Sequence, residues 1–288
     1  MRKATFGLLL CAAVSIATPG AIARAQQLAG TSVETEAEVL SDKVNDPVAI
    51  LTQLKSQDIY TPRNFQSTAQ TNTIQLQTVL PIDPSSIIAL EQVVRPTLKV
   101  QTQAVGPSSQ TITEFDDLQL FDLFILPWPD ESTTSFAWGL GPMFVFPTAT
   151  ASETGKQAWQ LGPALAMEFR GVPRMRIGFL FQNPISYAYT SRSATPQNQM
   201  LLQPAISFRL GNGWYVKSAD STLTVNWRHQ TSTTLPISFG FGRVWDWPSL
   251  KLDTWVSGEW TSYLQFAGIT PMYSVRFGIT LLLPDFDL

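Results

Sequence analysis

The only histidine of the chain, His229, lies close to Ser232 and Thr233 in the segment NWRHQTSTT. A hydroxyl group beside an imidazole is the core of a nucleophile and base pair, which is the arrangement that a hydrolase would use. The segment offers no recognisable third group that would orient the imidazole. A histidine in a solvent-facing loop explains the same residues, and we therefore expect a protein that is not an enzyme.

Side chains that bind metals are scarce. The chain has one His and one Cys, which excludes the usual transition-metal sites. Glu114, Asp116 and Asp117 in TEFDDLQ form an acidic cluster whose carboxylates suit Ca²⁺, but the spacing of an EF-hand loop is missing. A solvated strand end explains this cluster as well, so we expect neither a metal site nor a cofactor.

Seven charged residues fall on the polar side of segments in which apolar residues alternate with others. They are Glu168, Arg170, Arg176, Arg209, Asp253, Glu259 and Arg276. Charge is costly against lipid and tolerable inside a barrel, so these residues are candidates for lining a lumen. They would either form a constriction that selects solutes by charge and size, or pair with one another to fill a small barrel. Both interpretations stay open.

A period of two organises the segments that would position these charges. In YSVRFGITLLLP, near the end of the chain, every second residue is apolar and mostly polar residues lie between. The apolar positions are Tyr273, Val275, Phe277, Ile279, Leu281 and Leu283. This alternation is typical of a strand with one apolar face. That face would pack on a core in a soluble protein, whereas it would contact lipid in an outer-membrane barrel.

Similar segments recur along the chain. The clearest are AWQLGPALAMEFRG, QMLLQPAISFRLG and TLPISFGFG, and noisier ones cover 71–81, 86–102, 115–127, 135–147, 174–187, 214–228 and 249–260. A weak candidate near 60–67 brings the total to about twelve. Many are longer than the roughly 5–6 residues of ordinary strands and long enough for a tilted membrane strand of about 9–11. We expect an all-β fold, namely a transmembrane antiparallel up-and-down β-barrel of about twelve strands.

The composition agrees with an exterior that is not entirely in water. Charged residues make up 14% of the chain, against about a quarter in typical proteins. The net charge of −3 gives no reason to expect nucleic acid as a partner. Most tryptophans fall near the ends of predicted strands, where aromatic girdles lie, although interior packing is the alternative. These are Trp138, Trp159, Trp214, Trp227, Trp245, Trp247, Trp255 and Trp260.

Prolines interrupt several of these otherwise regular strands. Pro142, Pro163, Pro184, Pro204 and Pro236 each remove a donor from the hydrogen-bond ladder. Since a closed barrel has no edge strand, we expect bulged or locally opened strands at these positions. Such strands are also candidate places for a lateral opening.

The N-terminal part divides into two segments. Residues 1–25 have a basic start, a short apolar stretch and an A-x-A pattern, which is typical of a secretory signal peptide cleaved near Ala25. Residues 26–59 are polar and helix-prone and would lie in the periplasm or plug the barrel, which would then occupy residues 60–288.

Two capping signals predict one or two short helices within residues 26–59. Thr31 and Glu34 have the spacing of a capping box. In NDPVAILTQL, Asp46 is a predicted N-cap and Pro47 would occupy the first helical position.

The phrases NDPVAILTQL, WGLGPMFVFPTAT, WQLGPALAM, LLQPAISF and VRFGITLLLP together resemble a family of bacterial outer-membrane proteins linked to the meta-pathway of phenol degradation, some of which are labelled neuromedin U. The resemblance covers about residues 45 to 284. It implies an outer-membrane β-barrel that transports small molecules, with hydrophobic or aromatic ones as candidates, and it brings no catalytic residues.

Three function classes follow from these patterns. The first is an outer-membrane channel, whose partners are outer-membrane lipid, a small-molecule solute and the barrel-assembly machinery; a barrel without an open pore is a variant of it. The second is an exported soluble β-sandwich or barrel that acts as a binding or structural module. The third is an outer-membrane hydrolase.

Overall fold

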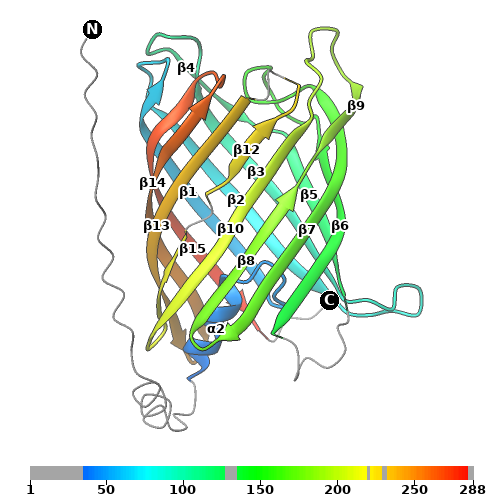
Figure 1. The fold of residues 1–288 in the computed structure, drawn as a ribbon, viewed down its shortest axis with the longest axis vertical. Helices are drawn as coiled ribbons and strands as arrows, with labels where there is room; N and C mark the ends of the chain where they lie inside the picture. The colour runs from blue at the N-terminus through cyan, green and yellow to red at the C-terminus, as the bar shows by residue number, and fades with distance from the viewer. Residues whose placement is uncertain (1–34, 127–134, 219–220, 229–231, 285–288) are drawn as a thin grey trace, which may run out of the picture. The chain divides into compact units, whose positions relative to one another are not determined.

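A single antiparallel sheet that closes on itself makes up most of the computed structural model, which describes residues 35–126, 135–218, 221–228 and 232–284. The strands are β1 (Thr52–Phe65), β2 (Thr71–Ile82), β3 (Gln92–Ala104), β4 (Thr111–Phe115), β5 (Leu118–Ile125), β6 (Phe136–Phe146), β7 (Ala158–Val172), β8 (Met175–Gln182), β9 (Ile185–Tyr189), β10 (Gln199–Gly211), β11 (Trp214–Lys217), β12 (Leu223–Asn226), β13 (Ser232–Trp247), β14 (Leu250–Gln265) and β15 (Thr270–Leu283). β1 pairs with β15 and closes the barrel (Figure 1).

The fifteen strands run along the barrel in twelve passes, which we call crossings. Three of these crossings each consist of two consecutive strands. β4 and β5 share one crossing, β8 and β9 another, and β11 and β12 a third. The prediction of an antiparallel barrel of about twelve strands is therefore confirmed. The first strand begins at Thr52 rather than near residue 60, because Thr52 to Tyr60 already pair with β15.

The outer face of the barrel is apolar and the inner face is mostly polar. On β15, Phe277 is 50% exposed, whereas its neighbours Ser274 and Thr280 on the other face are 2% and 1% exposed. Similar exposed apolar residues cover β13 and the other long strands. Five of the tryptophans, namely Trp159, Trp214, Trp227, Trp247 and Trp260, also lie exposed on the outside.

The prolines disturb the ladder in different ways. The register shifts between Leu235 and Pro236, and the break between β8 and β9 falls at Pro184, as expected for residues that lack an N–H. Pro142 and Pro163 stay within β6 and β7, where they are direct cross-strand partners, and Pro204 pairs with Phe179 inside β10.

In the described part of the chain, one helix precedes the barrel. α2 (Glu36–Val44) begins after the N-cap Thr35, and Glu38 accepts a hydrogen bond from the backbone N–H of Thr35 at 3.1 Å, as in a capping box. The capping box predicted at Thr31 and Glu34 lies outside the described residues. The helix expected after Asp46 does not form, because the Asp46 carboxylate caps the N–H of Val48 in a turn instead.

Candidate functional site

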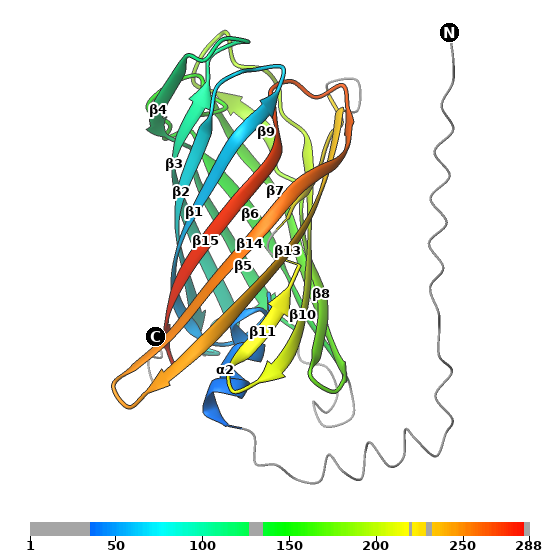
Figure 2. The same ribbon diagram turned by 90° about the vertical axis from the view of Figure 1, so that its left-hand side faces the viewer.

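Residues 36–51, which we call the inner segment, lie against the inside of the wall at the end of the barrel where β1 begins and β15 ends. We call this the proximal end and the opposite end the distal end (Figures 1 and 2). Leu40, Val44 and Leu51 pack with Tyr215, Val244, Trp255 and Leu282 of β11 to β15. Val48 packs on the opposite wall with residues such as Leu123 and Met143. The inner segment thus contacts both sides of the lumen.

Three arginines from neighbouring strands hold two carboxylates of the inner segment. Arg170 of β7 donates to Asp46 at 2.5 Å and Arg176 of β8 donates to Asp42 at 2.7 Å. Nη1 of Arg209 on β10 lies 3.5 Å from the same Asp42 carboxylate. Both carboxylates are buried, so these ion pairs join the segment to the wall in a site of low dielectric.

The other sequence candidates lie in local pairs. Glu168 is 1% exposed and accepts a hydrogen bond from Nε of Arg170 at 2.6 Å. Glu259 accepts two bonds from Arg276, at 2.8 and 2.7 Å. Asp253 accepts a bond from the Tyr215 hydroxyl at 2.6 Å. The structure thus brings four of the seven together beside the inner segment, and places Asp253, Glu259 and Arg276 on β14 and β15.

A cavity of about 420 Å³ lies inside the barrel beyond the inner segment. Its lining is rich in glutamine and threonine side chains, and it includes five cationic residues: Lys55, Arg95, Lys99, Lys217 and Arg276. Asp253 is the only acidic residue among the described residues that line it. The cavity is therefore polar and carries an excess of positive charge.

Four of the five cations are engaged by the protein. Lys55 donates to the carbonyl of Val44 at 3.3 Å and Arg95 to the carbonyl of Pro47 at 3.4 Å, so both bind the inner segment from above. Lys217 lies 3.7 Å from the centre of the Trp255 ring, and Arg276 is paired with Glu259. Trp255, which was grouped with the predicted girdle, is only 6% exposed and lines the cavity.

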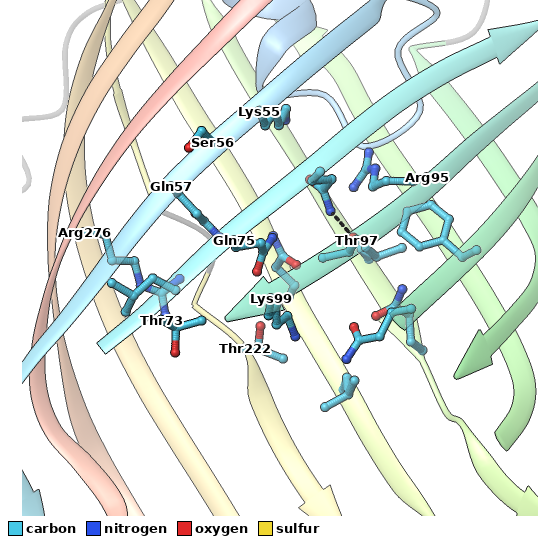
Figure 3. Close-up of a pocket in the computed structure, with 18 of the residues that line it drawn as sticks. Lys55, Ser56, Gln57, Thr73, Gln75, Arg95, Thr97, Lys99, Thr222 and Arg276 are labelled. Carbon is cyan, nitrogen blue, oxygen red and sulfur yellow. Dashed lines mark hydrogen bonds between the residues drawn. The ribbon is translucent and has the colours of Figure 1, made fainter. Parts of the chain in front are cut away.

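Register aligns the polar side chains of β1, β2 and β3 into rows. Gln57 lies opposite Gln75, which lies opposite Lys99; in the adjacent row, Lys55, Gln77, Thr97 and Gln119 follow one another. Figure 3 shows several of these side chains, among them Gln57, Gln75 and Lys99. Gln77 donates a hydrogen bond to Thr97 at 2.9 Å. Sequence reasoning missed these residues, although glutamine, threonine and lysine do alternate with other residues along each strand.

The acidic cluster has a structural role. Asp117 accepts bonds from the backbone N–H groups of Ala149 at 3.1 Å and Lys156 at 2.7 Å, and Glu114 accepts one from Thr150 at 2.6 Å. These contacts anchor the loop between β6 and β7. Among the described residues, no group of three or more metal-binding side chains is arranged around a common point. His229 lies outside the described residues.

No protein-family model matches the sequence, and no curated protein matches it. The fold is similar to a solved structure described as the COG4313 outer membrane channel from Pseudomonas putida F1, with a TM-score of 0.60 and 10% identity over 83% of this chain and 98% of that chain. The NanC porin has a TM-score of 0.49 with 11% identity over 79% of this chain and 98% of that one. At such identities the likeness concerns the fold. None of the helices in the described residues is long and apolar enough to cross a bilayer.

Proposed function

We propose that this chain is an outer-membrane β-barrel channel that passes small molecules through its lumen. The observation that carries the proposal is the pairing of an apolar exterior with a polar cavity of about 420 Å³ inside a closed wall. The proximal end would face the periplasm, since bacterial barrels of even strand number keep both ends there. The signal peptide, cleaved near Ala25, and the barrel-assembly machinery would bring the chain to the membrane.

The seven charged candidates divide into two roles under this proposal. Arg170, Arg176 and Arg209 hold the inner segment, which narrows the periplasmic half of the lumen, and Glu168 is a second partner of Arg170. Asp253 and Arg276 line the passage above it, with Glu259 as the partner of Arg276. The protein acts by diffusion through the lumen and not by covalent chemistry.

Two measurements on the same sample test the proposal. The mature protein should be recovered in outer-membrane fractions and should show heat-modifiable gel mobility, because a closed membrane barrel resists unfolding by detergent without heat. Reconstituted in planar bilayers, it should give discrete single-channel currents. A soluble protein without a heat shift would instead support the exported binding module, in which the apolar faces pack on each other.

A barrel without an open pore is the second candidate, and the inner segment favours it. This segment contacts both walls at the proximal end, so it could seal the lumen. A heat-modifiable membrane protein that gives no current, and whose liposomes do not swell in sugar solutions, would support the sealed barrel over the channel.

Hydrophobic or aromatic solutes, which the resemblance to the phenol-pathway family suggests, would need a route through the wall. The facing prolines Pro142 and Pro163 offer one place where the ladder lacks two donors. A disulfide between Leu140→Cys and Leu165→Cys, which are register partners on β6 and β7, should block such a route while leaving ionic currents unchanged. Equal uptake of an aromatic solute before and after cross-linking would exclude this exit.

A further inference from the structure

Lys99 differs from the other cations of the cavity. Among the described residues, no acidic side chain forms an ion pair with it and no group accepts a hydrogen bond from its ammonium group, whereas Lys55, Arg95, Lys217 and Arg276 are each held by the protein. The Asp116 carboxylate attracts the charge of Lys99 without forming an ion pair with it, and it accepts hydrogen bonds from Gln101 at 2.5 Å and from the N–H of Asp117 at 2.7 Å. A partly buried ammonium group that donates no hydrogen bond within the protein is stabilised further by an anion or by water.

The neighbours of Lys99 in its row are also available to a ligand. Gln75 lies directly opposite Lys99, and Gln57 directly opposite Gln75. Neither amide forms a side-chain hydrogen bond within the described part of the chain, in contrast to Gln77 in the adjacent row. Figure 3 shows the three side chains on neighbouring strands, whose spacing is about 4.7–4.9 Å. Each amide offers two donors and one acceptor, which is the pattern that hydroxyl groups match.

We propose that the row Lys99, Gln75 and Gln57 is a binding site in the lumen for small polyhydroxylated anions such as sugar acids. Lys99 would pair with the carboxylate, and the two glutamines would exchange hydrogen bonds with the hydroxyl groups. The cavity volume of about 420 Å³ falls in the range of roughly 300–1,000 Å³ that is usual for small-molecule sites. The excess of cations around the row repels small cations and attracts anions. This inference rests on the proposed channel function, since solute must reach the lumen.

The test compares two probes of equal length on the folded protein in detergent. Gluconate and sorbitol differ only in that one end of gluconate is a carboxylate, and saturation-transfer NMR measures the affinity of each. We expect gluconate to bind at least tenfold more tightly than sorbitol, because a charge-assisted hydrogen bond contributes more than a neutral one. Equal affinities, or no binding of gluconate, would overturn the proposal.

Two variants and one further probe locate the site. Lys99→Gln should weaken gluconate binding about tenfold and leave sorbitol unchanged. The control Lys43→Gln, on the exposed side of α2 and away from the cavity lining, should bind gluconate as the original protein does. Hexanoate carries the same charge without hydroxyl groups, so it should bind more weakly than gluconate. Equal binding of hexanoate, or an unchanged affinity in Lys99→Gln, would refute the assignment.

Heat-modifiable mobility of each variant checks that it has folded. Gluconate binding in detergent is measured at equilibrium, so it requires entry into the cavity but no passage through the whole barrel. Failure of binding in a protein that conducts would therefore refute only the anion site. A protein that binds gluconate but gives no current would refute the channel and leave the anion site in place.

Discussion

The two halves of the lumen use the same charged residue types in opposite ways. At the proximal end, Arg170, Arg176 and Arg209 are matched by carboxylates of the inner segment, which narrows the lumen. Beyond that segment, five cations line the cavity with one carboxylate among them. The comparison teaches that arginines paired with carboxylates of the inner segment fix that part of the chain in place, whereas the cations beyond it surround a cavity with room for a solute.

Neutralising the Asp42 and Asp46 carboxylates should have the largest effect on channel behaviour. In the double variant Asp42→Asn and Asp46→Asn, three arginines each lose one ion pair, although Arg170 keeps Glu168, and breaking a buried ion pair typically costs about 3–5 kcal/mol. Arg170 is 38% exposed, so its share is smaller than that of the buried Arg209. We expect the inner segment to leave the wall, so that single-channel conductance rises and trypsin cuts after Lys43 much faster.

A matched control separates docking from charge alone. Asp83→Asn with Glu153→Gln changes the net charge by the same amount at two exposed positions. This control should conduct and resist trypsin as the original protein does. If the double variant of Asp42 and Asp46 behaves like the control, the ion pairs do not hold the inner segment.

Trp255 lies at the boundary between the two halves and should give the next largest effect. Its side chain packs with Val44 and Leu51 of the inner segment, and the Lys217 ammonium group forms a cation–π contact with its ring. A methyl group added at Gly278 would lie 2.2 Å from Trp255 Cε2, so Gly278→Ala must displace the ring. We expect a loss of about 1–3 kcal/mol of stability, seen as a lower temperature of heat modification.

Gly258 is the control for this variant, because a methyl group added there meets no atom within 4 Å. Gly258→Ala should leave the transition temperature and the tryptophan emission unchanged. Equal behaviour of the two alanine variants would mean that the Trp255 ring is free to move, and that the boundary between the halves is loose.

Neutralising Arg276, the paired cation above Trp255, should change the ion selectivity of the channel by a smaller amount. Arg276→Gln leaves Glu259 without its partner, so the ratio of anion to cation permeability should fall by a few-fold, measured as a reversal potential in a salt gradient. Adding Glu259→Gln should restore much of the ratio. Arg209→Gln should instead weaken the docking of the inner segment. A variant that neutralises both Arg209 and Arg276 would therefore change docking and ion selectivity at once, whereas the single variants separate them.

The alternation of apolar residues was enough to predict the barrel. In β15 and β13 each side chain has only two directions, and the apolar set must face away from the polar set. The three divided crossings and the start of β1 at Thr52 were not predicted, because bulges and breaks depend on the neighbouring strands rather than on the local pattern.

The site was predicted only in part, and for a similar reason. The alternation of apolar and polar residues along each strand placed Arg170 and Arg209 on the polar face. The sequence near these arginines does not indicate that Asp46 and Asp42 are their partners. Asp46 followed by Pro47 fits the start of a helix and a capped turn equally well, and tertiary contacts decided for the turn. The row of Gln57, Gln75 and Lys99 depends on the register of three strands, which the sequence does not specify by itself.

The smallest effect is expected at the start of α2, where Glu38 joins the helix to the wall. Its carboxylate accepts a bond from the N–H of Thr35 at 3.1 Å and another from the N–H of Asn212 at 3.3 Å. Glu38→Ala should cost about 0.5–2 kcal/mol, which is the usual value of a lost cap, and should raise the rate of tryptic cleavage after Lys43 by a small factor. Val39→Ala, at an exposed position of the same helix, is the control and should leave the rate unchanged. Because cleavage follows the population of the undocked segment, an increase as large as that of the Asp42 and Asp46 variant would mean that the cap, and not the arginines, holds the inner segment in place.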